Sequence, residues 1–134
     1  MKIKYILILI LVSEVGFTQP SSYQTFSDFV QYSSSIDAYS NICVKNFNEE
    51  EARSELFELI ILLQRTAALS DKDISELKDK YSSINKSTTS QLVQLGVNRN
   101  RALCVNYLKI FERFDAKKNA ALDKLIEITY EQRD

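Results

Sequence analysis

Residues 98–132 read NRNRALCVNYLKIFERFDAKKNAALDKLIEITYEQ, the longest amphipathic pattern in the chain. Apolar side chains recur there at intervals of three and four, which places them on one face of an α-helix. We therefore predict a long C-terminal helix. Asp115 and Lys118 interrupt the apolar face, either as a polar contact to a ligand or partner or at a change of register that returns both to solvent. We favour the second, because unpaired buried charges are costly.

The same spacing predicts further helices upstream. Over residues 22–46 the apolar face carries serine at 33 and 40, where large residues are expected. These two serines allow close helix packing or leave a cavity. A second helix begins after Asn48, which is followed by three glutamates in the first turn, and ends near Leu69. Ser70 caps a third, shorter helix that ends near residue 84.

Residues 85–90 are rich in Ser, Thr and Asn, and we predict a loop there. Asn85 begins an Asn-Lys-Ser glycosylation sequon, which matters only in a eukaryotic source. Either Thr88 and Gln91 form a capping box that starts the last helix, or Gly96 marks a break before that helix begins near residue 98. Turn residues are otherwise scarce and no alternating strand pattern occurs, so the fold class is all-α, a small up-down bundle of three to four helices.

The two cysteines are predicted to form one disulfide. Cys43 lies near the end of the first helix and Cys104 near the start of the last. In an up-down-up-down bundle these two ends meet. The alternative is two separate buried thiols.

The N-terminus indicates export. Lys2 and Lys4 precede a short apolar run, residues 6–12, which is too short to span a membrane and is typical of a signal peptide. We predict residues 1–18 as signal peptide and 19–134 as a single domain, secreted or periplasmic, where a disulfide persists. A retained signal anchor is the alternative.

Composition argues against catalysis and against nucleic acid. The chain has no histidine and a formal net charge of −1, which becomes −2 without residues 1–18. Histidine-dependent mechanisms and the helical zinc motifs that need histidine are thereby excluded, and the charge balance supplies no concentrated positive field to bind phosphates. Glu51, Glu55 and Glu58 share one helix side, but we interpret them as a solvated face. We expect no catalytic residue, no metal and no cofactor.

A second apolar line on the helix after Asn48 is the main candidate interface. Phe57 and Ile61 lie nearly opposite the main apolar face, and Ala68 extends the line. An exposed line of this kind marks a protein interface, whereas in a bundle it can pack internally. We predict a non-enzymatic interaction protein, of inhibitor or immunity type, that binds a protein partner or its own copy. The alternative is a carrier of a small apolar ligand in a cavity at Ser33 and Ser40.

Overall fold

The computed structural model describes residues 22–97 and 101–131, and the expected signal peptide lies outside them. These residues form four long helices and one helix of a single turn. The helices are α2 (Tyr23–Cys43), α3 (Glu49–Gln64), α4 (Asp71–Gln94), α5 (Ala102–Val105) and α6 (Tyr107–Glu131). No strand occurs within the described ranges. The predicted all-α bundle with a long C-terminal helix is confirmed.

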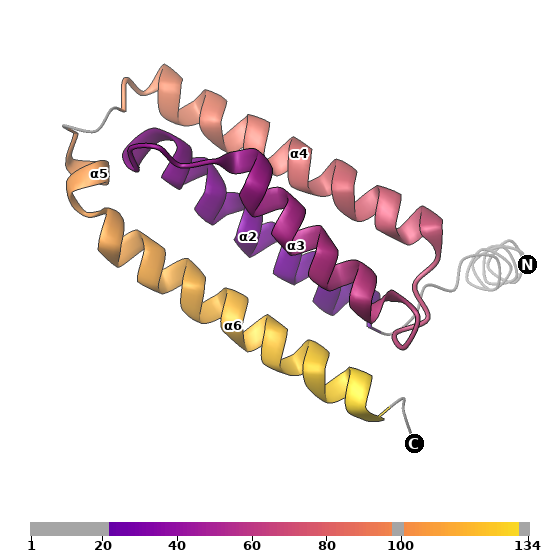
Figure 1. The fold of residues 1–134 in the computed structure, drawn as a ribbon. Coiled ribbons are helices and arrows are strands. Elements are labelled where there is room, and N and C mark those ends of the chain that lie inside the picture. The colour runs from indigo at the N-terminus through magenta and orange to yellow at the C-terminus, as the bar shows by residue number, and fades with distance from the viewer. Residues whose placement is uncertain (1–21, 98–100, 132–134) are drawn as a thin grey trace, which may run out of the picture.

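The first described helix, α2, is the centre of the molecule. It packs against α4 and α6 along most of its length and against α3, while α3 also touches α4. Figure 1 shows α3 in front of α2, with α4 along one side and α6 along the other. The helices alternate in direction, up-down-up-down. The buried side chains that join them include Phe26, Phe29, Val30, Leu56, Ile60, Leu77, Tyr81 and Leu125.

Both predicted helix starts have side-chain caps. The Asn48 carboxamide oxygen accepts from the Glu51 backbone N–H at 3.1 Å, at the start of α3. Ser70 and Asp73 form a reciprocal capping box at the start of α4, with bonds of 3.0 and 2.9 Å. These bonds satisfy amide groups that have no partner within the helix.

The loop predicted at 85–90 is wrong, because α4 continues without a break to Gln94. Ser, Thr and Asn lower helix propensity by only a few tenths of a kcal/mol each. Tyr81, Asn85 and Leu92 recur on one side of α4 and are all buried. Burial of this face therefore outweighs the local preference for a turn. The helix ends at Gln94 rather than near residue 84, and Gly96 follows it in a left-handed conformation with φ of 69°.

The disulfide between Cys43 and Cys104 is confirmed, with the two Cα atoms 5.2 Å apart. It ties the last residue of α2 to the short α5. The C-terminal helix differs from the prediction at this end, because it is divided at Asn106 into α5 and α6. Ser40 and Tyr107 hydroxyls, 2.7 Å apart, join α2 to the start of α6 beside the bridge.

Candidate functional site

A cleft of about 300 Å³ lies between α2, α3 and α6. Residues of α2 form its floor, and α3 and α6 form its two walls. Four of its side chains carry charge or an amide. The lining consists of Phe29, Ser33, Asp37, Ala52, Glu55, Leu56, Leu59, Lys118, Asn119 and Leu122.

The cleft exists because α3 leans towards α4 rather than α6. Phe57 of α3 packs edge-on against the Tyr81 ring of α4, with ring centroids 6.0 Å apart. Among the described residues, α3 and α6 have at most marginal contact, although both pack on α2. The α3 side that carries Ala52, Glu55 and Leu59 therefore faces the cleft instead of a neighbouring helix.

Asp37 is the buried charge of the cleft floor, with 8% of its surface exposed. Its carboxylate accepts a hydrogen bond from the Tyr81 hydroxyl. Burial raises the pKa of Asp37 above its ordinary value, against smaller opposing effects of the Tyr81 bond and of Lys118. The same burial, together with the Asp37 carboxylate, raises the pKa of Tyr81. Asp37 thus keeps a polar group at the bottom of a cleft whose lining mixes apolar and charged side chains.

Lys118 is the cationic group of the cleft. Its ammonium lies over the Phe29 ring, 6.0 Å from the centroid, and it attracts Asp37 electrostatically. Lys118 is half-buried against Phe29 of α2, so the predicted return of this residue to solvent is wrong. Asp115 is half-buried and accepts from Asn119 Nδ2 at 3.1 Å.

Exposed apolar side chains continue both walls beyond the cleft. Leu62 follows Leu59 by three residues on α3 and is 77% exposed. Ile126 follows Leu122 by four residues on α6 and is 49% exposed. This spacing keeps each on the same helix side as the cleft residue before it. The two residues extend the apolar surface of the walls, and a contiguous exposed apolar surface marks an interaction site.

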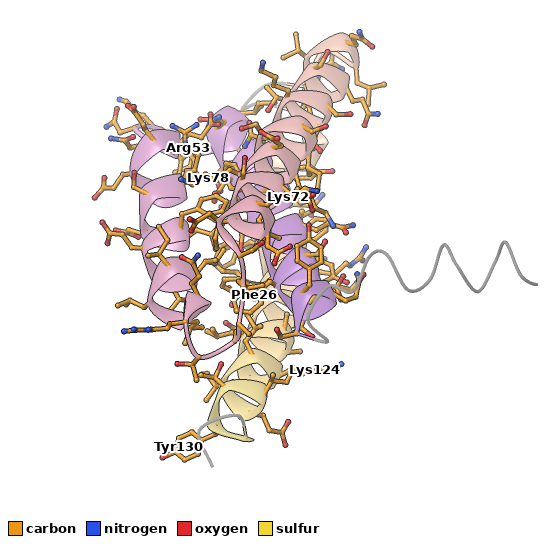
Figure 2. The ribbon with its side chains drawn as sticks, turned by 90° about the vertical axis from the view of Figure 1, so that its right-hand side faces the viewer. Phe26, Arg53, Lys72, Lys78, Lys124 and Tyr130 are labelled. Atoms are coloured by element: carbon orange, nitrogen blue, oxygen red, sulfur yellow. A yellow bond between two sulfur atoms is a disulfide. The ribbon has the colours of Figure 1, made fainter. Side chains whose placement is uncertain are left out.

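The structure separates the three residues of the predicted partner-binding line, Phe57, Ile61 and Ala68, into one buried and two exposed residues. Phe57 is 5% exposed and belongs to the core, so its assignment to a surface is corrected: α4 covers it through Tyr81. Ile61 is 49% exposed and Ala68 is also exposed. Ile61 lies beside α4, with Ile74 and Lys78, and not in the cleft. Figure 2 shows Lys78 and Arg53 on this α3–α4 side.

Ser33 and Ser40, proposed from the sequence to line a cavity, have different surroundings. Ser33 lines the cleft and its hydroxyl donates to the Phe29 carbonyl at 2.8 Å. Ser40 bonds to Tyr107 and is buried. Serine at these positions keeps α2 narrow where α6 approaches. The space beside Ser33 is an open, charged cleft, which suits a small apolar ligand poorly.

Asn85, in the sequon, lies inside the molecule. It is 5% exposed, and its Nδ2 has no hydrogen-bond partner. Glycosylation joins the sugar to this nitrogen and adds a bulky group. The folded domain therefore has no room for a glycan at Asn85.

Asp37 and Leu62 were missed by sequence reasoning. Asp37 lies one turn after Ser33, where it resembles the other polar residues of α2, and only burial distinguishes it. Leu62 lies in a run of five apolar residues, 59–63, so the sequence pattern does not show which face of the helix it occupies.

No group of three potential metal ligands occurs among the described residues, and no helix there is long and apolar enough to span a membrane. Comparisons of the chain with family models, with curated proteins and with solved structures gave no match.

Proposed function

We propose that this protein is an exported, non-enzymatic binding module that holds a protein partner in the α2–α3–α6 cleft. Export is supported by the signal-like residues 1–18 and by the disulfide, which persists in oxidising compartments. The lack of histidine and the engagement of Asp37 by Tyr81 support a role without catalysis. An inhibitor or immunity protein is one form that such a module takes.

The separation of α3 from α6 is the observation that carries this proposal. It leaves an open cleft whose two walls end in exposed apolar residues, Leu62 and Ile126. A small-molecule carrier encloses its ligand and surrounds it mainly with apolar groups. This cleft is open and contains Asp37, Glu55 and Lys118, which favours a protein partner.

Two neighbouring residues of α3 provide a matched test. Leu62 follows the cleft residue Leu59 by one turn, whereas Ile61 lies on the α4 side of α3. Both are exposed, so neither change to glutamate should alter stability by more than about 0.5 kcal/mol. The mature protein would be cross-linked to the proteins of its own extracytoplasmic fraction. We expect Leu62→Glu to abolish a specific cross-link that Ile61→Glu retains. Equal cross-linking by both variants would contradict the proposal.

A further inference from the structure

Building on the proposed function, we propose that the partner inserts an amphipathic helix into the α2–α3–α6 cleft, with a lysine or arginine placed at Glu55 and Asp37. Apolar side chains of the same helix would pack between the cleft walls, against Leu59 and Leu122.

The charge of the cleft points to a basic occupant. Two carboxylates, Asp37 and Glu55, line it against one ammonium, Lys118. Lys118 lies over the Phe29 ring and attracts Asp37. Glu55 is exposed on the opposite wall. A second cation would balance the lining, and its alkyl stem would cover apolar surface.

The α3 wall strengthens this preference. Glu51 precedes Glu55 by one helical turn, so both carboxylates lie along the same side of α3. The arginine nearest to them in sequence, Arg53, lies on the other side of α3, beside Lys78 of α4. Within the described helix α3, the side that borders the cleft therefore carries carboxylates and no cation.

The shape of the cleft favours a helix. Its walls, α3 and α6, run in the same direction along α2, as Figure 1 shows. Along α3, Glu55, Leu59 and Leu62 follow at spacings of four and three; along α6, Lys118, Leu122 and Ile126 follow at spacings of four. Each wall thus changes from charged to apolar in the same direction. A helix laid in this groove meets charge at one end and apolar surface at the other.

The test uses two synthetic helical peptides with the same leucine stripe, one carrying lysine and the other glutamate at one end of it. A third peptide has the composition of the lysine peptide in scrambled order. Binding to the disulfide-bonded mature protein is measured by fluorescence anisotropy at low salt. We expect the lysine peptide to bind at least about tenfold more tightly than the other two, since close charge pairs contribute a kcal/mol or more.

Glu55→Lys and Glu50→Lys form the matched pair of variants. Both residues are exposed on α3 and both changes alter the net charge equally, but Glu50 is not among the residues that line the cleft. We expect Glu55→Lys to remove the preference for the lysine peptide and Glu50→Lys to retain it. Leu62→Glu should weaken binding of the lysine peptide, and Ile61→Glu should not.

Several results would overturn the inference: equal binding of the lysine and glutamate peptides, no binding of either, or equal effects of the two charge variants. A dimer in sedimentation velocity that Leu62→Glu dissociates would also overturn it, because a second copy would then be the occupant. None of these outcomes bears on the cross-linking test of the proposed function, in which Leu62→Glu loses a specific cross-link that Ile61→Glu retains. Loss of that contrast alone would instead contradict the proposed function.

Discussion

At the scale of single residues, α2 is unusual in burying many hydroxyl groups. Ser22 and Ser34 donate to carbonyls of other segments, Ala67 at 3.2 Å and Tyr81 at 2.7 Å. A buried polar group is costly unless it is hydrogen-bonded, and these two are. Their small side chains let neighbouring segments approach α2 closely. The polar residues of this helix thus contribute to packing.

Asp37 differs from the other buried polar residues of α2 because it is ionisable, and its burial disfavours the charged form. The raised pKa means that the folded chain holds this proton more tightly than the unfolded chain does. The stability that Asp37 contributes is therefore fully present below pH 3.8 and is lost as pH rises through the raised pKa.

We expect Asp37→Asn to be more stable than the wild type at pH 7, because asparagine stays neutral and still accepts from the Tyr81 hydroxyl. The advantage should shrink as pH falls towards 4, where Asp37 becomes protonated. Thermal melts of both proteins across this range measure the difference. Asp79→Asn, at an exposed position on α4, is the control. An Asp37→Asn advantage that is independent of pH, or no advantage at all, would contradict the expectation.

At the scale of the element, α3 shows how periodicity alone misassigns faces. Phe57 lies opposite the main apolar stripe in the sequence, yet it is buried, because α4 covers that side of the helix. Leu59, on the main stripe, is only partly buried, because its side faces the open cleft. The packing of neighbours therefore reverses the ranking of these two positions.

We accordingly expect Phe57→Glu to be the more damaging of two matched changes. It places a charge beside Tyr81 and removes a buried ring, so it should destabilise by several kcal/mol and unfold a domain of ordinary stability. Leu59→Glu should retain helicity, because the new carboxylate can reach solvent through the cleft. Circular dichroism melts compare the two. Greater loss of structure with Leu59→Glu would show that the cleft is closed in solution.

At the scale of the whole molecule, the disulfide connects segments far apart in sequence. Cys43 and Cys104 lie 61 positions apart, and all of α3 and α4 lies between them. At the other end of the bundle, α6 continues past the start of α2, and Figure 2 shows Tyr130 at its projecting tip. The bridge thus secures α5, directly before α6, while Ala121 and Leu125 of α6 pack in the core.

Removing the bridge should weaken the fold but keep its helices. In the chain-entropy model, closing a loop of this length lowers the entropy of the unfolded chain enough to stabilise by about 4 kcal/mol. We expect the double variant Cys43→Ser, Cys104→Ser to retain its helical circular dichroism and to unfold at a lower urea concentration. The wild-type protein with its disulfide reduced should show the same helical signal and the same lower urea midpoint as this variant. An unchanged midpoint would show that the bridge adds no stability.

The sequence by itself determined the helical class, the caps at Asn48 and Ser70, and the pairing of the cysteines. Each of these follows from local chemistry or, for the cysteines, from the matching ends of antiparallel helices. Only the tertiary structure decided that residues 85–90 are helical, that Phe57 is covered and that Asp37 is buried at a cleft. The reason is physical: a helix's periodicity shows which residues share a face, but only its neighbours determine whether that face meets protein or solvent.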